Sequence, residues 1–375
     1  IATAMAGVVT LISISNIRSS SNRSLFLNTL LILVLVALHG LFTDFGKITS
    51  AKTLLTLGMS FILVASFAAY QKATQKQRLY LFFAMAVVVL LVNLIAVSGY
   101  WANKAYYDQM LLQSKSIPIP NMHHIHFGVI NAICILIIAG VWAREKSHTL
   151  RPYIMVVGIL ILICFHILSS RTGLLSFYGG SMVVLFVYAL REKAYKVLIL
   201  GPLSLCLLAV IAYVSNSSLQ SKIDNSIEDI QSWGHDDEIN HKSMAMRIEA
   251  YKMCAQIIRE NPLGVGAEQQ DQSQQAMYEK QNTVLTLENR VGPHNQWLEY
   301  GVKYGWLGIV LFSIFIVQWF KLLPASSHFF WGILAVFVIS MLFESLLDRQ
   351  KSIYFSMTLL PLAYHILKKD TKMEY

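Results

Sequence analysis

The residues best suited to chemistry include a histidine at the start of an apolar run. His294 follows Gly292 and Pro293, and the run after it is compatible with a helix. Pro293 suits the first helical position, which would place His294 and Asn295 in the first turn among unpaired backbone N–H groups. Helix ends of this kind bind oxygen-rich anions such as phosphates. His294 is therefore a candidate for contact with a phosphate-bearing substrate, although a histidine can also be a hydrogen-bonded structural residue.

Two arginines are the next candidates. Arg171 lies in a turn of a few residues between two apolar runs, and a guanidinium held there could bind a phosphate through two parallel hydrogen bonds. It could equally extend to lipid headgroups. Arg247 lies in the segment 242–260, whose periodicity predicts an amphipathic helix, so it could be a solvated charge. The predicted apolar face of that helix contains Met244, Ile248, Tyr251, Ala255 and Ile258.

Further polar residues gather near the ends of apolar runs. Glu344 and Asp348 stand close to Arg349 and could either pair with basic residues or orient catalytic groups. His126 lies at the entrance of an apolar run and could contact a substrate. Its neighbours His123 and His124 have no carboxylate near them in the sequence, so we expect no metal site.

The composition places these residues in a membrane protein. Of the 375 residues, 55% are hydrophobic and 14% are charged, too little polar surface to cover a soluble domain. Eleven segments are long enough, as helices, to cross a hydrocarbon core of about 30 Å. They lie at residues 1–15, 25–42, 53–70, 79–98, 125–143, 153–168, 174–190, 197–214, 306–322, 329–346 and 353–367. We therefore predict an all-α polytopic membrane protein.

The distribution of lysine and arginine predicts the orientation. Alternate short loops and the C-terminal tail contain 15 of these residues, and the other short loops contain 7. The positive-inside rule assigns the richer set to the cytoplasm. A cytoplasmic N-terminus, which is the commoner arrangement, would require one span before Ile1 and twelve in the full-length protein. The net charge of +9 is thus explained by topology, and we expect no nucleic-acid partner.

This orientation divides the chain into three regions: residues 1–214 with eight spans, a large outward-facing loop at 215–305, and residues 306–375 with three spans and a cytoplasmic tail. The loop is far longer than an ordinary connector. No Walker or GxGxxG motif occurs, and the cytoplasmic loops are short, so ATP hydrolysis is not expected. Chemistry is expected on the outer face.

At these residues the chain resembles the O-antigen ligase family (WaaL), within a superfamily that also contains O-antigen polymerases and bacterial protein O-oligosaccharyltransferases. The family motif is a histidine followed by Asn, Ser or Gln, then nine residues and Gly-x-x-Gly. It is matched here by His294-Asn295 and by Gly305 to Gly308. The turn around Arg171 and the segment from Arg247 to an Asn-Pro-Leu-Gly turn at 261–264 are also similar to the family, and the likeness covers about residues 125–367.

The resemblance implies a glycosyltransferase of the Gram-negative inner membrane with its active site facing the periplasm. The donor would be an O-antigen polysaccharide on undecaprenyl diphosphate and the acceptor lipid A–core oligosaccharide, with membrane lipids around the protein. His294 would be the base, and Arg171 and Arg247 would hold the leaving diphosphate, which makes a metal and any other cofactor unnecessary and predicts inversion. Substrate contacts are expected from Asn295, Arg290, Arg349 and His126.

Other activities are compatible with the same residues. An O-antigen polymerase or a protein O-oligosaccharyltransferase would use the same class of donor with a different acceptor. A polymerase more often has two large outer loops, and a protein transferase a larger C-terminal part. A transporter or flippase would need ionisable residues near the middle of the spans, whereas most here stand near the outer ends.

Overall fold

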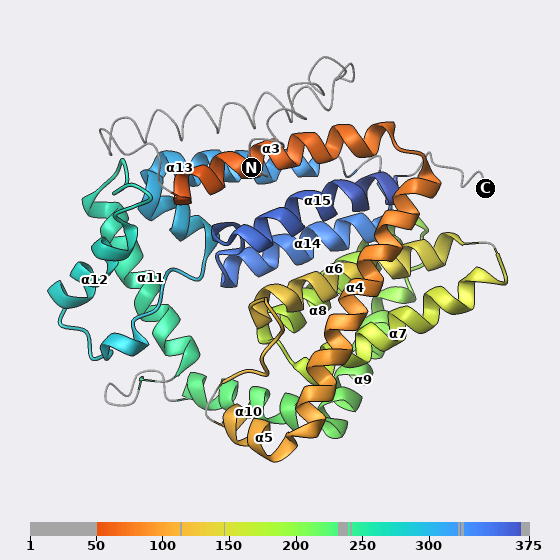
Figure 1. Ribbon diagram of the computed structural model, residues 1–375, viewed down its shortest axis with the longest axis horizontal. Helices are drawn as coiled ribbons and strands as arrows, with labels where there is room; N and C mark the ends of the chain where they lie inside the picture. The colour runs from red at the N-terminus through yellow and green to blue at the C-terminus, as the bar shows by residue number, and fades with distance from the viewer. Residues whose placement is uncertain are drawn as a thin grey trace. The chain divides into compact units, whose positions relative to one another are not determined.

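A computed structural model describes residues 51–112, 115–145, 147–231, 239–240, 242–321, 323 and 326–368. Within these ranges the chain is helical and forms no strand, as the sequence predicts (Figure 1). The described residues divide into two compact units, and each is considered by itself.

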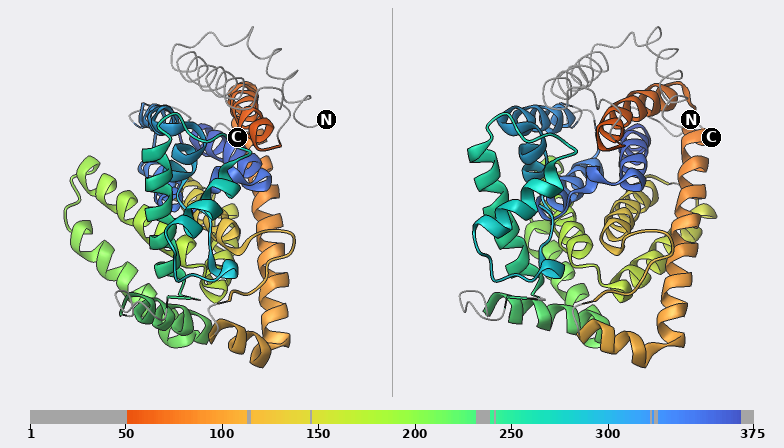
Figure 2. Two further views of the ribbon diagram at one scale, coloured as in Figure 1. Left: turned by 90° about the vertical axis from the view of Figure 1, so that its left-hand side faces the viewer. Right: turned by 60° about the vertical axis from the view of Figure 1, so that its left-hand side comes forward.

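The first unit contains the described residues of Ile1–Lys72, Asp229–Leu322 and Met341–Pro361. Its helices pack α11 against both α12 and the long helix α13 (Figures 1 and 2). The elements are α3 (Ala51–Lys72), α11 (Ser243–Glu260), α12 (Gln270–Lys280), α13 (Gln296–Phe320), the short 3-10 helices η1 (Leu287–Asn289) and η3 (Leu346–Asp348), and the first part of α15 (Gln350–Leu367).

The second unit contains the described residues of Ala73–Glu228, Leu323–Ser340 and Leu362–Tyr375. In it α6 packs against α7 and α8, and α4 packs against α7. The elements are α4 (Gln75–Ala102), α5 (Lys104–Leu112), α6 (His124–Arg144), α7 (Leu150–Leu168), α8 (Arg171–Arg191), α9 (Val197–Ser215), most of α10 (Ser217–Gln231) and most of α14 (His328–Phe343).

Six of the described helices are long and apolar enough to cross a membrane: α4, α6, α7, α8, α9 and α13. Helix α14 is apolar but shorter. Helices also cover the predicted spans at 53–70 and 353–367, whereas those at 1–15 and 25–42 lie outside the described residues. The fold is therefore that of an all-helical, multi-pass membrane protein, and the number of eleven spans stays a prediction.

Helix α13 starts earlier than the predicted span at 306 and is broken within its length. Gly305 has φ +67° and ψ −159°, a conformation in which a side chain would be strained. The break leaves carbonyl groups of the preceding turn without helical partners, and the turn after α11 supplies donors to them. The amides of Val265 and Gly266 donate to the carbonyls of Val302 and Lys303 at 2.9 and 3.0 Å.

The contact also works in the opposite direction. The amide of Trp306, just past the break, donates to the carbonyl of Pro262 at 3.0 Å. Gly264, with φ +85°, brings its backbone against Lys303 and Gly305 so closely that a Cβ would lie 2.5 Å from backbone atoms. The Asn-Pro-Leu-Gly turn and the first glycine of the Gly-x-x-Gly motif are therefore two sides of one backbone contact, which fixes α11 on α13.

We predict that Gly305→Ala destabilises the first unit. The new Cβ would lie 2.0 Å from the Pro262 carbonyl oxygen, so the turn would have to move. Strain of this kind costs about 1–3 kcal/mol before any lost hydrogen bond is counted. Thermal unfolding of the purified protein should show a lower midpoint than the wild type. Gly292→Ala is the matched control, because nothing lies within 4 Å of its Cβ position. Equal midpoints for the two variants would contradict the role of the break.

Candidate functional site

His294 lies immediately before α13, in a conformation set by the helix start. Asn295 is the N-cap, and its side-chain oxygen accepts hydrogen bonds from the amides of Trp297 and Leu298 at 2.9 and 3.1 Å. The prediction that Pro293 opens the helix is thus wrong by three residues, because asparagine satisfies the free amides that proline cannot. His294 itself has φ +43°, a left-handed backbone that turns the chain into the helix.

The imidazole of His294 meets a buried carboxylate. Its Nδ1 lies 3.0 Å from Oε2 of Glu344, whose side chain is only 4% exposed. An ionised carboxylate can only accept, so the tautomer that fits this contact carries its proton on Nδ1 and its lone pair on Nε2. The histidine side chain is 25% exposed. This arrangement orients an accessible imidazole with Nε2 as the basic nitrogen.

Arg247 approaches the same carboxylate. Its terminal guanidinium nitrogen lies 3.9 Å from Oε2 of Glu344, and its side chain is 14% exposed. The alternative in which Arg247 is simply a solvated charge is therefore wrong. Glu344 thus pairs with basic residues, one of the two alternatives for it, and its role in orienting a catalytic group stays a prediction. A histidine, a carboxylate and an arginine from three separate segments meet at one point of the first unit.

Tyr251 and Asn295 connect α11, α13 and the end of α14 beside this point. The Tyr251 hydroxyl lies 3.2 Å from the carbonyls of His294 and Leu342, and the Asn295 amide donates to Leu342 at 3.1 Å. Burial raises the pKa of Tyr251, so its hydroxyl stays protonated and can donate throughout the physiological range. These bonds hold the backbone of His294 and of the residues preceding Glu344 in place.

The face of α11 that carries Arg247 and Tyr251 differs from the face predicted to be buried. Ala255 of the predicted apolar face is exposed, and Met244, Ile248 and Tyr251 are only partly buried. The buried face packs on α12 and Val302 through Ala250, Met253, Cys254, Ile257 and Ile258. Of the predicted face only Ile258 lies in that core. The helix has two neighbouring apolar stripes. The stripe predicted to be buried is the one that lies beside His294.

A buried charge cluster fixes the segment after Glu344 to α13. Lys303, 5% exposed, lies 2.6 Å from Oε1 of Glu299 and also forms an ion pair with Asp348. Ser345 donates to the other oxygen of Glu299 at 3.2 Å, and Gln296 accepts from the amide of Leu347 at 2.7 Å. Apart from the Lys303–Glu299 pair within α13, these bonds join the first turns of α13 to residues 345–348, directly after Glu344. The cluster therefore sets the position of the carboxylate relative to His294.

Two further predicted contacts lie elsewhere in the first unit. Arg290 is engaged within the loop, where its guanidinium lies 3.7 Å from Glu279 and 5.9 Å from the Tyr278 ring centre. Arg349 follows η3 and is exposed. A role of either residue in substrate binding stays a prediction.

Arg171 and His126 belong to the second unit. Arg171 is the first residue of α8 and is partly buried. Its turn is tightly mounted on α6: a Cβ on Gly173 would lie 2.9 Å from the Cα of Gly128, so only glycines allow this approach. His126 is buried in the first turn of α6, 5.5 Å from the ring centre of His123. The rigid mount expected for Arg171 is present, and the roles of both residues stay predictions.

The sequence analysis did not predict the contacts that Lys303 and Tyr251 make near the site. Lys303 was one polar residue in a loop-like segment, although its spacing of four from Glu299 is a signal for an ion pair on one helix face. The pair also qualifies the expectation that the spans are apolar, because α13 includes both residues before its break. Tyr251 stands four residues after Arg247, and the same spacing could have placed it beside the arginine.

Chemically, the cluster can accept a proton from a hydroxyl group and stabilise a developing anion beside it. Nε2 of His294 is the acceptor, Glu344 holds the ring, and the guanidinium of Arg247 supplies positive charge. Among the described residues, no group of three or more His, Cys, Asp or Glu side chains is arranged to hold a metal ion.

A comparison with protein families supports the resemblance seen in the sequence. Residues 156–313 match the family model described as O-antigen ligase. This part of the chain is similar to the O-antigen ligase superfamily. The matched segment contains Arg171, Arg247, His294 and both glycines of the Gly-x-x-Gly motif, and it ends before Glu344. A search of curated proteins found no match. The superfamily is one of membrane ligases and polymerases that act on lipid-linked polysaccharides.

We predict that Lys303→Met destabilises the protein strongly. Removing the cation leaves the carboxylates of Glu299 and Asp348 without their shared partner, and breaking a buried ion pair typically costs about 3–5 kcal/mol. Thermal or denaturant unfolding in detergent measures the loss. Lys252→Met is the control, because Lys252 is 59% exposed and its pair with Glu249 should contribute less than about 1 kcal/mol. Adding Glu299→Gln and Asp348→Asn to Lys303→Met should restore part of the loss, and an equal loss in both lysine variants would argue against the cluster.

Proposed function

We propose that this protein is an O-antigen ligase that transfers a polysaccharide from undecaprenyl diphosphate to lipid A–core oligosaccharide. The observation that carries the proposal is the meeting of His294 Nδ1 and Arg247 at one buried oxygen of Glu344. Transfer to a sugar hydroxyl needs a base, and departure of a diphosphate needs a cation. The cluster supplies both within one unit of a chain that is similar to the O-antigen ligase superfamily.

In the proposed reaction, Nε2 of His294 removes the proton from the acceptor hydroxyl. The oxygen attacks the anomeric carbon of the donor sugar, a new C–O bond forms, and the bond from that carbon to the diphosphate oxygen breaks. Undecaprenyl diphosphate leaves with the bonding electrons, and His294 later releases its proton to water. A single displacement of this kind inverts the anomeric configuration. Glu344 keeps the ring oriented and stabilises the imidazolium that forms.

The leaving diphosphate is proposed to bind arginine. Arg247 lies beside the histidine and carries the charge that develops on the leaving oxygen. Arg171 is proposed as a second cation for the same group on the basis of its sequence setting, with the close packing of nearby Gly173 on Gly128 in support. Because guanidinium groups provide the charge, the reaction should proceed without a divalent metal, and because the donor is already activated, it should proceed without ATP.

The proposed location is the inner membrane of a Gram-negative bacterium, with the cluster facing the periplasm. The apolar helices and the family support a multi-pass membrane protein, and the lysine and arginine distribution supports the orientation. Asn295, Arg290, Arg349 and His126 are proposed substrate contacts. Polymerases and protein oligosaccharyltransferases share the donor class, so the acceptor decides among them.

We predict that His294→Ala lowers transfer by about 100-fold to 10,000-fold, the usual contribution of a general base. The assay combines purified protein and lipid-linked donor with three separate acceptors: lipid A–core, a second lipid-linked chain and a pilin. Product is expected with lipid A–core, equally with and without EDTA. His148→Ala, at an exposed histidine, should retain full activity. Full activity of His294→Ala would overturn the role of the base, and product with another acceptor alone would overturn the ligase assignment.

The role of Glu344 gives a graded outcome in the same assay. Glu344→Gln can still accept a hydrogen bond from Nδ1 but cannot stabilise the imidazolium, so its rate should lie between those of the wild type and His294→Ala. A rate equal to that of the wild type would show that the carboxylate is only structural.

Arg247→Lys should lower the turnover number about tenfold or more while preserving the fold. Lysine keeps the charge but loses the two-pronged geometry that matches phosphate oxygens. Arg259→Lys, an exposed arginine near the end of the same helix, is the control and should be unaffected. Equal rates for both variants would show that Arg247 does not bind the leaving group.

A further inference from the structure

A second polar cluster lies in the second unit, beside a cavity of about 470 Å³ that the proposed reaction does not use. The cavity is lined where α4, α7 and α9 end and α10 begins. Its deeper walls are apolar and come from the two spans α7 and α9, with Ile163, Leu208 and Ile211 among them. None of its lining residues belongs to the cluster around His294.

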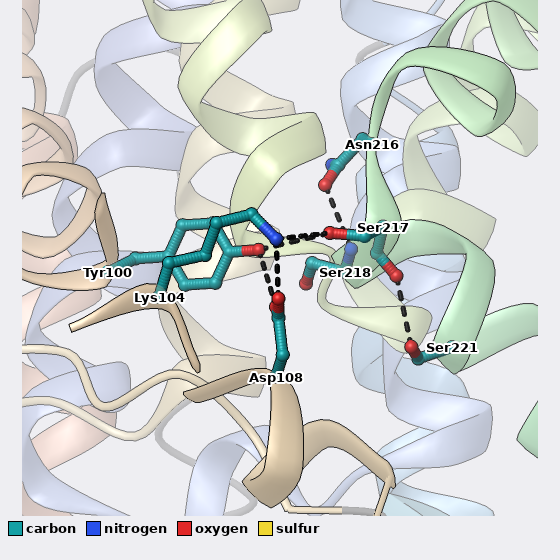
Figure 3. A network of polar contacts seen from close by, with 7 residues as sticks. All are labelled: Tyr100, Lys104, Asp108, Asn216, Ser217, Ser218 and Ser221. Atoms are coloured by element: carbon teal, nitrogen blue, oxygen red, sulfur yellow. Dashed lines mark hydrogen bonds and ion pairs between the residues drawn. The ribbon is translucent and has the colours of Figure 1, made fainter. Parts of the chain in front are cut away.

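The other end of the cavity is polar and cationic. The Lys104 ammonium, the Ser217 hydroxyl and the Gln220 side chain line it. Figure 3 shows Lys104 and Tyr100 converging on Ser217 and Asp108, with both Lys104 Nζ and the Tyr100 hydroxyl 3.3 Å from the Ser217 hydroxyl. Asp108 pairs with Lys104 and does not line the cavity. The cavity therefore presents hydrogen-bond donors and a positive charge at one end only.

The polar end is held in a defined geometry. Tyr100 is 1% exposed, and its hydroxyl donates to Asp108 at 2.8 Å. Asn216, just before α10, donates to the carbonyl of His166 at the end of α7 at 2.7 Å and accepts from the Ser218 amide at 3.1 Å. The hydrogen bond from Lys104 to Asp108 holds the pKa of Lys104 above its usual value, so the ammonium stays charged. The charge and the hydroxyl are thus fixed where three apolar helices end.

The cavity opens to the exposed outer surface of the helices that line it. Ile163 is 52% exposed, Ile211 is 56% exposed, and Trp101 at the polar end is 57% exposed. Exposed aliphatic side chains on spans face lipid, and tryptophan is typical of the level where the bilayer meets water. The polar end therefore lies at headgroup depth and the apolar walls at acyl-chain depth.

We propose that this cavity binds one phospholipid, with its phosphate on Lys104 and Ser217 and an acyl chain along Ile163, Leu208 and Ile211. The chemical match is the argument: a cation for the phosphate, a hydroxyl on Ser217 whose proton can turn from Tyr100 to the phosphate, and an apolar wall continuing from them into the membrane. Bilayer phospholipids are also the molecules that surround these helices at the highest concentration. This proposal does not depend on the proposed transferase activity.

The test is lipid binding to the purified full chain, measured by native mass spectrometry after delipidation. Three probes are titrated: dioleoyl phosphatidylglycerol, dioleoylglycerol without a phosphate, and undecaprenyl phosphate. One saturable site that prefers phosphatidylglycerol is expected. Equal affinity for dioleoylglycerol would overturn the phosphate contact, and a preference for undecaprenyl phosphate would overturn the assignment to a bilayer phospholipid.

Matched variants locate the site. Ile163→Trp should fill the cavity and weaken phosphatidylglycerol binding, whereas Ile159→Trp, one turn earlier on α7 and also exposed, should not. Lys104→Gln should weaken phosphatidylglycerol about tenfold and leave dioleoylglycerol unchanged, because only the phosphate loses a hydrogen bond with a charged group. Lys193→Gln, at the turn before α9, removes the same charge elsewhere and should have no effect. Equal affinities within either pair would overturn the proposal, and the lysine pair suffices if a tryptophan variant does not fold.

Discussion

The first unit depends on one backbone contact, the docking of the turn after α11 onto the break in α13. Three backbone groups next to Gly305, the carbonyls of Val302 and Lys303 and the amide of Trp306, find partners in residues 262–266. No side chain is needed for these bonds, and three glycines with positive φ, Gly264, Gly266 and Gly305, lie at the contact. Since α11 carries Arg247 and Tyr251 while the start of α13 carries His294, the contact determines whether these side chains face one another.

Charge is distributed in this unit so that each buried group has a partner. Glu344 lies between His294 and Arg247. Lys303 lies between Glu299 and Asp348 in a second group of charges. The first group is partly open to solvent, and the second is closed. Burying charges is costly unless they are paired, and even a paired buried cluster adds little net stability. We therefore explain the buried cluster of Lys303, Glu299 and Asp348 by the segment that it holds in position. What it positions is the carboxylate that orients the histidine.

Much of this architecture was predictable from the sequence, because apolar length and turn residues report directly on helices. Helices α4, α6, α7, α8 and α9 and the helix bearing Arg247 followed from apolar length and periodicity, whereas the short helix α5 was not predicted. The start of α13 did not, since proline at the first helical position and asparagine as the cap are both good local choices and only tertiary context selects between them. The buried face of α11 was wrong for a similar reason: two apolar stripes compete, and packing on α12 decides.

The contact of Glu344 with His294 and Arg247 could not be predicted from the sequence. Glu344 is 50 residues from His294 and 97 residues from Arg247 in the chain. Local patterns carry no information on which of two nearby acids, Glu344 or Asp348, would take which cation. That choice is made by the geometry of the turn at 345–348, where Ser345 and Leu347 bond to α13.

The nine residues between the His-Asn pair and Gly305 fix the distance between His294 and the break in α13. They form a continuous stretch of α13 from its cap to its break, so His294 stands about 15 Å along the helix axis from the docked turn. Each helical residue also turns the chain by about 100°, and an insertion or deletion of one residue would swing the histidine away from Arg247 by more than a quarter of a circle. The number of residues in the segment thus sets an angle as well as a distance, in addition to the contacts that its buried side chains make.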